Sequence, residues 1–305
     1  MGWQNIWLEE KFRQYYAKNL PEPPAEIEKR EFGYGFQGKI DARHASFQDR
    51  QDFYKFLVGE APRYISYSAA FYERPEARPM SRKGWLGAEL IFEFDVHCDH
   101  GRVVCRECLE KARQDTIRLI EDFLVPDFGI SEEEVTVNFS GARGYHIHAD
   151  NEWLRQLGKE ARRDIAEFVT GTGVNLKILP PESVWAKKLS GLKGKKREEA
   201  FKKKVLDIDV NVTIDIARLI RCPDTLHGGT GLLAKRIKDL KSFDPTKDPV
   251  VFSNYPVKIT LVKDFPEHEL KGVSFGPWAK GEEKTVPEYL AVMLACSESA
   301  VIEKG

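Results

Sequence analysis

The segment ELIFEFDV, residues 89–96, alternates between apolar and mostly polar side chains. Such alternation predicts a β-strand with one buried face and one half-exposed face. Glu93 and Asp95 share one face, so their carboxylates are expected to lie side by side, an arrangement that suits Mg²⁺ or Mn²⁺. Polar residues alternate on any half-exposed strand, so this pair needs support from elsewhere in the chain. The opposite, apolar face carries Leu90, Phe92, Phe94 and Val96.

Other segments predict the rest of the fold. Residues 134–140 (EVTVNFS) have strand periodicity, and residues 145–149 are expected to pair with them after a Gly-Ala-Arg-Gly turn. Residues 205–210 (VLDIDV) also alternate, and their Asp209 could complete a three-carboxylate cluster. Because strands and helices mix without a regular βαβ rhythm, we expect an α+β fold with a largely antiparallel sheet. Helical spacing of apolar residues predicts helices over 5–18, 106–124, 153–171 and 214–221.

Composition and charge describe a globular chain with one strongly basic segment. The 305 residues suffice for roughly two domains, or one large domain with an insert. Hydrophobic residues are 42% and charged residues 31% of the chain, which excludes wholesale disorder. The net charge is −1, but residues 187–204 hold eight Lys and one Arg against Glu198 and Glu199, a local charge of +7 that leaves −8 elsewhere. This run is either a solvated helix or mobile loop, or a contact for a phosphate backbone beside an active site.

Three of the five cysteines fall within residues 98–108, which indicates a metal site in a reducing compartment. Cys105 and Cys108 have the spacing of a metal knuckle, and Cys98 with His100 can supply the other two ligands of a tetrahedral Zn²⁺ site. His97 competes with His100 for that role. Four protein ligands leave no open position, so we expect a structural zinc.

The stretch SGARGYHIH, residues 140–148, combines a tight turn with three polar side chains. Ser140 ends one strand, Arg143 lies at the tip of the turn, and His146 follows on the next strand. Backbone N–H groups, a guanidinium and an imidazole that face one space suit a triphosphate. The same stretch alone is also typical of an ordinary hairpin.

A second glycine-rich stretch, ARLIRCPDTLHGGTG, spans residues 217–231. We expect Arg218 and Arg221 on the helical segment and His227 in an ordered loop. Arg221 and His227 are candidate phosphate contacts. Taken alone, the stretch is also typical of a basic helix C-terminus with a glycine-rich exit.

Together these stretches resemble the catalytic small subunit of the archaeal/eukaryotic-type DNA primase, in the archaeo-eukaryotic primase superfamily. They occur in family order and at roughly family spacing, and the resemblance covers about residues 5–295. The matching stretches are REFGY (30–34), ARHASF (42–47), GAELIFEFD (87–95), the cysteine knuckle, FSGARGYHIH (139–148), IDVNVTIDIARLIRCPDTLHGGTGL (208–232) and PEYLAVML (287–294).

The resemblance implies a primase catalytic domain over residues 1–305, with a mixed or antiparallel-sheet core. It implies an inserted zinc knuckle at about 97–108 and a smaller, basic, partly helical subdomain at about 153–204. The implied activity is synthesis of short RNA or DNA primers on single-stranded DNA from nucleoside triphosphates, by nucleotidyl transfer with two Mg²⁺ or Mn²⁺ ions. The implied partners are the template, the nascent primer and a primase large subunit in a heterodimer.

The resemblance also implies roles for individual residues. Glu93, Asp95 and Asp209 would hold the catalytic metals. The family has Asp where this chain has Glu93, which is one methylene longer and changes the expected metal geometry. The incoming nucleotide would be bound by Ser140, Arg143, His146, Arg221 and His227, and the structural zinc by Cys98, His100, Cys105 and Cys108.

Two other functions fit parts of this pattern. A repair-type primase-polymerase would share the carboxylates and the nucleotide-binding residues, although the knuckle and the lack of an attached ligase or helicase segment favour the replicative primase. A non-catalytic zinc-containing nucleic-acid-binding subunit would be compatible with Glu93.

No apolar run approaches the ~20 residues of a membrane span, and MGWQNIWLEEKF at the N-terminus lacks a signal-peptide core. We therefore expect a protein that is neither secreted nor in a membrane, in the cytoplasm or nucleoid of an archaeon or the nucleus of a eukaryote.

Overall fold

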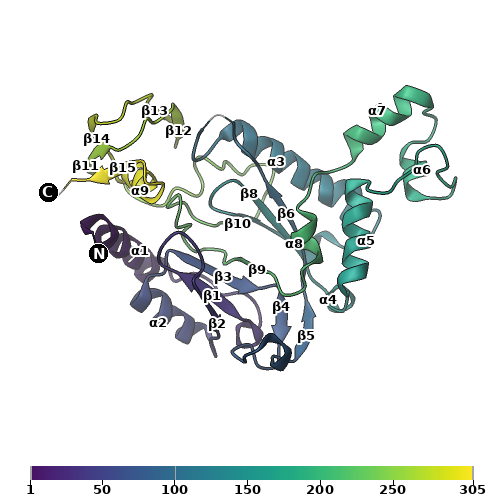
Figure 1. Cartoon of the computed structure of the whole chain (residues 1–305), viewed down its shortest axis with the longest axis horizontal. Helices are drawn as coiled ribbons and strands as arrows, with labels where there is room; N and C mark the ends of the chain where they lie inside the picture. Colours follow the sequence, from purple (N-terminus) through teal and green to yellow (C-terminus); the bar gives the residue numbers. More distant parts are fainter. Residues whose placement is uncertain (1, 100, 304–305) are drawn as a thin grey trace.

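Two four-stranded antiparallel sheets lie side by side in the centre of the molecule (Figure 1). The computed structural model describes residues 2–99 and 101–303. It has the α+β architecture that the sequence predicts. The helices are α1 (Trp3–Asn19), α2 (Arg50–Glu60), α3 (Arg106–Leu119), α4 (Glu152–Arg155), α5 (Lys159–Thr170), α6 (Val184–Lys188), α7 (Gly194–Lys204), α8 (Val210–Ile214) and α9 (Glu288–Cys296). The strands are β1 (Phe32–Gly35), β2 (Ala42–Ala45), β3 (Tyr64–Ser68), β4 (Ala70–Tyr72), β5 (Trp85–Ala88), β6 (Leu90–Asp95), β7 (Val135–Phe139), β8 (Gly144–Ala149), β9 (Leu219–Arg221), β10 (Arg236–Ile237), β11 (Pro256–Leu261), β12 (His268–Leu270), β13 (Val273–Phe275), β14 (Glu283–Pro287) and β15 (Ala300–Ile302).

The first sheet, with strand order β10-β7-β8-β6, carries the acidic strand. β6 pairs with β8 so that Glu93 lies opposite His146 and Asp95 opposite Gly144. β8 also pairs with β7 across the expected turn. Phe92 and Phe94 are buried and α3 packs against β6 and β8. The register is therefore set by burial of the apolar face of β6, which leaves the carboxylates on the other face.

The second sheet, with order β2-β1-β3-β9, corrects the predicted helix over 214–221. Residues 219–221 form β9, in which Arg221 lies opposite Ser66 of β3. The Asp215 carboxylate accepts a hydrogen bond from the N–H of Ala217 at 2.9 Å, which turns the chain after α8. The buried, β-branched Ile220 then favours an extended strand. Arg218 and Arg221 consequently do not lie on a helix.

The predicted strand over 205–210 is also wrong. Leu206 and Ile208 are buried and Asp207 and Asp209 are exposed, so the alternation is real. Residues 205–209 nevertheless join no sheet, and Asp209 donates a single backbone hydrogen bond to the carbonyl of Glu93 at 3.1 Å. The Asp209 side chain accepts from the N–H groups of Asn211 and Val212, which makes it the N-cap of α8. A good N-cap residue therefore starts a helix where the alternation predicted a strand end.

The predicted helix over 153–171 is two helices, α4 and α5, which are separated at residues 156–158. Gly158 is the N-cap residue of α5, and glycine is a poor residue for a helix interior. The helices predicted over 5–18 and 106–124 are confirmed, the second as α3 followed by a π-helical turn over Ile120–Leu124.

Two smaller parts flank the sheets. α6 and α7 project from α5, far from the C-terminal part (Figure 1). That part contains the sheet β14-β11-β15 and α9, whose nine residues are all buried. Within residues 2–99 and 101–303, no helix combines the length and apolar character needed to cross a membrane.

Candidate active site

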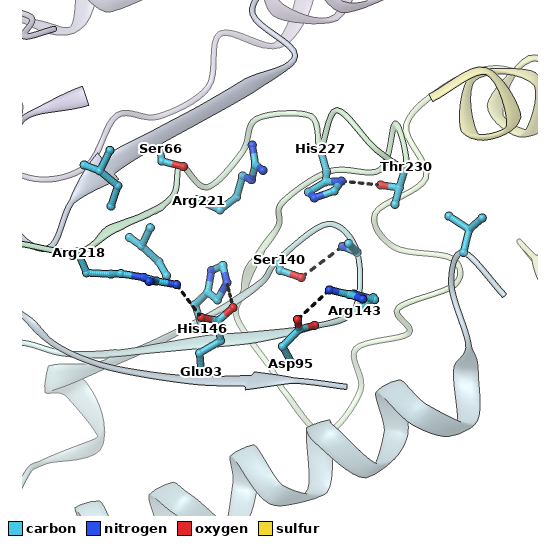
Figure 2. Close-up of a pocket in the computed structure, with 14 residues that line it drawn as sticks. Ser66, Glu93, Asp95, Ser140, Arg143, His146, Arg218, Arg221, His227 and Thr230 are labelled. Carbon is cyan, nitrogen blue, oxygen red and sulfur yellow. Dashed lines mark hydrogen bonds and ion pairs between the residues drawn. The ribbon is translucent and has the colours of Figure 1, made fainter. Parts of the chain in front are cut away.

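A cavity of about 390 Å³ opens where the two sheets meet (Figure 2). One wall comes from β6, β8 and the turn between β7 and β8, and the other from β3, β9 and the loop after β9. Ten of its lining residues are Ser66, Glu93, Asp95, Ser140, Arg143, His146, Arg218, Arg221, His227 and Thr230.

Glu93 and Asp95 point into the cavity side by side, as the sequence predicts, with an arginine at each flank (Figure 2). Arg218 lies 3.7 Å from the Glu93 carboxylate, and Arg143 lies 3.0 Å from that of Asp95. Nε2 of His146 lies 3.5 Å from Oε1 of Glu93. The two arginines partly neutralise an acidic pair that is partly withdrawn from water, whereas burial lowers the pKa of His146.

The two carboxylates differ in their pKa. Burial raises the pKa of Glu93, but His146 and the two arginines outweigh it, so the pKa falls below its ordinary value. Burial also raises the pKa of Asp95, and the adjacent charge of Glu93 adds to this; Arg143 compensates only in part. Two carboxylates that disfavour each other's charge are stabilised by a divalent cation, so their chemistry fits a Mg²⁺ or Mn²⁺ site.

The third predicted carboxylate is brought near the pair through its backbone and not through its side chain. The Asp209 N–H donates to the Glu93 carbonyl, while its Oδ1 caps α8 and does not line the cavity. Among the described residues, the only group of three or more potential His, Cys, Asp or Glu ligands within 4.8 Å of one another is a cysteine cluster. The three carboxylates therefore do not converge in this structure.

The turn before β8 is locked from two sides. The Ser140 hydroxyl accepts hydrogen bonds from the N–H groups of Ala142 and Gly144, at 3.3 and 3.1 Å. Gly141 has φ of +82°, and a Cβ there would lie 2.7 Å from Cβ of His227. The Thr230 hydroxyl donates to the carbonyl of Gly141. Ser140, predicted as a phosphate contact, thus shapes the turn that presents Arg143.

His227 lies in the opposite wall with its ring in a defined state. Its Nδ1 accepts a hydrogen bond from the N–H of Gly229 at 3.2 Å, so Nε2 carries the proton. Burial lowers the pKa of His227 well below its ordinary value, and the nearby Arg221 and His146 lower it further. The ring is therefore a neutral hydrogen-bond donor at neutral pH.

In this wall, Arg221 carries a buried hydrogen-bond donor that has no partner in the described part of the chain. Its guanidinium lies over the ring of Tyr64, 5.4 Å from the centroid, and burial lowers its pKa. One terminal nitrogen, Nη1, is buried without a hydrogen-bond partner among the described residues. A buried donor without a partner is costly, so this atom favours an anionic ligand in the cavity.

Sequence reasoning missed three polar residues that line the cavity. Arg218 was recognised as basic, but the expected helix gave no reason to place it against Glu93. Thr230 belongs to the glycine-rich loop that the sequence singled out, and its hydroxyl gave no separate signal. Ser66 sits inside an ordinary strand sequence, where nothing distinguishes it.

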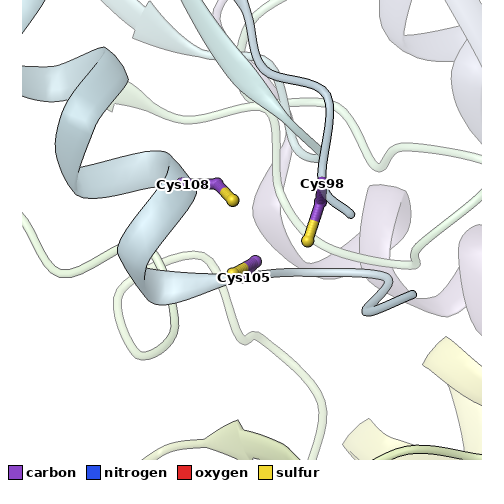
Figure 3. Close-up of side chains that lie close together, drawn as sticks. All are labelled: Cys98, Cys105 and Cys108. Atoms are coloured by element: carbon purple, nitrogen blue, oxygen red, sulfur yellow. The ribbon is translucent and has the colours of Figure 1, made fainter. Parts of the chain in front are cut away.

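Three cysteines gather between the segment that follows β6 and the N-terminal end of α3 (Figure 3). Cys98, Cys105 and Cys108 place their sulfur atoms within 4.8 Å of one another. Burial and the two neighbouring thiols raise the pKa of Cys108 to about 12, so a metal ion that binds there must displace protons. Three convergent sulfurs fit Zn²⁺, which takes four ligands. His100, the predicted fourth ligand, lies outside the described residues, and His97 is exposed.

The loop of the knuckle is braced against the C-terminal part. The N–H of Val103, which lines the cavity, donates to Nε2 of His268 at 2.8 Å. Nδ1 of His268 bonds the carbonyl of Pro266 at 2.9 Å. The edge of the cavity at Val103 is therefore tied to the C-terminal part.

The structure combines an α+β core, an acidic pair in a cavity with arginines at its rim, and a cluster of three cysteines. The family model described as DNA primase small subunit matches residues 94–239. The DNA primase small subunit PriS of Thermoplasma acidophilum is 34% identical over 95% of this chain and 98% of its own length. PriS of Archaeoglobus fulgidus is 32% identical over 97% and 98%, and that of Methanocaldococcus jannaschii 32% over 85% and 87%. The chain therefore belongs to the DNA primase small subunit family.

One solved structure is similar in shape. The polymerase domain of Mycobacterium tuberculosis ligase D in complex with DNA has a TM-score of 0.44 and 11% sequence identity. The match covers 78% of this chain and 83% of that structure.

Proposed function

We propose that this chain is the catalytic subunit of a primase, which makes short RNA or DNA primers on single-stranded DNA. The observation that carries the proposal is the cavity, which sets Glu93 and Asp95 against Arg221 and His227. In the reaction, a 3′-hydroxyl oxygen bonds to the α-phosphorus of a nucleoside triphosphate. The bond from that phosphorus to the oxygen bridging to the β-phosphorus breaks, and pyrophosphate leaves.

Glu93 and Asp95 would hold the catalytic Mg²⁺ or Mn²⁺ ions. Asp209 would join them if its side chain left the N-cap of α8 for the cavity. When bound, the ions lower the pKa of the attacking hydroxyl and neutralise the phosphates.

The opposite wall would hold the triphosphate. Arg221 offers its unpartnered nitrogen and His227 its Nε2–H, and hydrogen bonds to charged phosphate oxygens are strong. Arg143, exposed at the tip of its turn, would exchange Asp95 for a phosphate oxygen when a metal ion neutralises that carboxylate. Positioning and charge neutralisation would then supply most of the rate.

Further partners follow from the same proposal. The cysteine cluster would hold a structural Zn²⁺ that supports the Val103 edge of the cavity. A primase large subunit would join this chain in a heterodimer.

The test is unprimed synthesis on single-stranded DNA with labelled nucleotides and Mg²⁺ or Mn²⁺. We expect short products from the unaltered chain and at least about a 100-fold loss in Asp95→Asn, because a metal-ligating charge is removed. Asp164→Asn, an exposed carboxylate change on α5, serves as the matched control and should keep full activity.

The outcomes separate the competing functions. Extension of annealed primers without unprimed synthesis would favour a repair-type primase-polymerase. No nucleotide-dependent binding of Mn²⁺ and no product in either format would favour a non-catalytic subunit. Equal activity of Asp95→Asn and Asp164→Asn would refute the assigned site.

A further inference from the structure

We infer that the basic arm, residues 184–204, is a fixed phosphate-binding surface that tracks the backbone of the single-stranded template outside the cavity. This inference rests on the proposed function, because it assigns a second contact to the same nucleic acid. The arm comprises α6, α7 and their connection, and it projects beyond the sheets (Figure 1).

The lysines of α7 form a stripe on its outer face. At 100° per residue, Lys195, Lys196, Lys202 and Lys203 fall within about a third of the helix circumference. All four are exposed, whereas Phe201 on the opposite face is partly buried. Lys195 and Lys202 are two turns apart, about 10.5 Å along the axis, as are Lys196 and Lys203.

The positive charge of this stripe is larger than the negative charge beside it. In the described part of the chain none of the four lysines forms an ion pair, and the one acidic side chain on the same face of α7 is Glu199, which leaves a net charge of +3. Lys188 of α6, in contrast, pairs with Asp127 at 2.9 Å. The chain thus keeps four exposed positive charges together in a molecule that is otherwise acidic. A surface of this kind attracts a polyanion.

The arm is held in place by packing, which argues against a mobile loop. Trp185 is buried and packs edge-on against Phe201, with ring centroids 4.9 Å apart. Its indole N–H donates to the carbonyl of Phe168 at 3.2 Å, which ties α6 to α5. Gly171 at the end of α5 leaves space for Phe201, because a Cβ there would lie 2.5 Å from its ring. A rigid charged helix loses less conformational entropy on binding than a mobile one does.

The arm is also continuous with the catalytic site. Arg118 of α3 donates to the carbonyls of Lys203 and Lys204 at 2.7 and 2.8 Å and so anchors the end of α7. The five residues from there to Asp209 span at most about 17 Å. The C-terminal end of the arm therefore lies close to Asp209, whose N–H bonds the carbonyl of Glu93, and Lys196 lies about 12 Å further out along the axis of α7.

The side chains on the outer face of α7 favour nucleic acid over an acidic protein as the binding partner. Lysines act as point charges that contact phosphates without reading bases, and the described outer face of α7 presents no aromatic or large apolar side chain that would anchor a protein. The expected binding is independent of sequence and sensitive to salt.

The experiment compares two fourfold variants of the full chain. The arm variant carries Lys195→Gln, Lys196→Gln, Lys202→Gln and Lys203→Gln. The control carries Lys18→Gln, Lys55→Gln, Lys258→Gln and Lys280→Gln, which remove the same charge from exposed positions elsewhere. Binding of a fluorescent 20-nucleotide oligodeoxythymidylate is measured by anisotropy from 20 to 200 mM KCl.

We expect the arm variant to bind at least about tenfold more weakly at 50 mM KCl, with a salt slope less steep by about 2 to 3, because each phosphate contact on single strands contributes about 0.7. The control should bind like the unaltered chain. Unprimed synthesis at saturating template should be equal in all three proteins. Unaltered thermal melting shows that the exposed substitutions leave the fold intact.

Equal affinity of the two variants would overturn the inference, as would no measurable binding by the unaltered chain at 20 mM KCl. Competition by polyglutamate that is as effective per charge as DNA would overturn it in favour of an acidic protein partner. The unaltered chain could instead bind DNA through the arm and yet make no primer. That result would refute the proposed function and leave the inference of a nucleic-acid-binding arm intact.

Discussion

At the scale of single residues, the acidic pair shows how a predicted pattern and its surroundings combine. The shared face of Glu93 and Asp95 follows from a period of two, and burial of Phe92 and Phe94 enforces it. The partners of these carboxylates come from other elements: His146 from β8, Arg143 from a turn and Arg218 from beside β9. The Glu93 carboxylate contacts His146 on the neighbouring strand and Arg218 in the opposite wall of the cavity.

A change at Arg221 tests the cavity wall opposite Glu93 and Asp95 on its own. We expect Arg221→Gln to raise KM for nucleoside triphosphate about 10- to 150-fold, because a hydrogen bond to a charged group contributes about 1.5–3 kcal/mol. Turnover at saturating nucleotide should change less. Steady-state kinetics on a primed template measures both quantities.

Arg163→Gln is the matched control for this change, since Arg163 is exposed on α5 and outside the cavity. A KM in Arg221→Gln equal to that of the control would show that Arg221 does not contact the triphosphate.

At the scale of elements, strong hydrophobic periodicity predicted helices and strands correctly. The predictions failed where a local capping or turn residue competed with the periodicity. Periodicity identified β6, β7, β8, α1 and α3, whose apolar faces are buried. The capping role of Asp209 overrode alternation in residues 205–210, and the Asp215 turn replaced a helix by β9. The cavity wall formed by β9 is a consequence of long-range pairing with β3, which local sequence does not encode. The sequence therefore predicted half of the residues that line the cavity, but it did not predict how the two walls are arranged.

The cysteine cluster is the element whose loss should affect stability more than chemistry. We expect about one zinc per chain, because three sulfurs converge and zinc takes four ligands. Cys105→Ser should lose most of this zinc and lower Tm, since metal binding contributes directly to folding. Turnover of the protein that stays folded should fall less. Elemental analysis, thermal melting and active-site titration give the three values.

Cys222→Ala is the control for this experiment, because Cys222 is buried and outside the cluster. It should keep its zinc even if its Tm falls. A zinc-free unaltered chain with full stability would contradict the assignment.

At the scale of the whole molecule, a buried polar network joins the two sheets. Arg30, which precedes β1, donates to the carbonyls of Ser68 and Ala69 at 2.9 Å and pairs with Glu89, which precedes β6. The second carboxylate oxygen of Glu89 lies 2.7 Å from Nδ1 of His148 on β8. All of these side chains are buried. Because the cavity lies where these sheets meet, the network helps to hold its two walls in register.

This network should make the folded state sensitive to acid. Burial raises the pKa of Glu89, but Arg30 and His148 outweigh it and lower the pKa from 4.5 to about 2. A carboxylate whose pKa is lower in the folded than in the unfolded state stabilises the fold above pH 4.5, and this contribution is lost as the pH falls toward 2. The shift corresponds to about 3 kcal/mol. Between pH 6 and pH 2.5, the free energy of unfolding of the unaltered chain, measured by urea titration, should therefore fall by about 2–3 kcal/mol more than that of Glu89→Gln. This variant is less stable at pH 6, but it has no carboxylate charge to titrate at this position. Equal losses in both proteins would show that Glu89 is not held ionised by its partners.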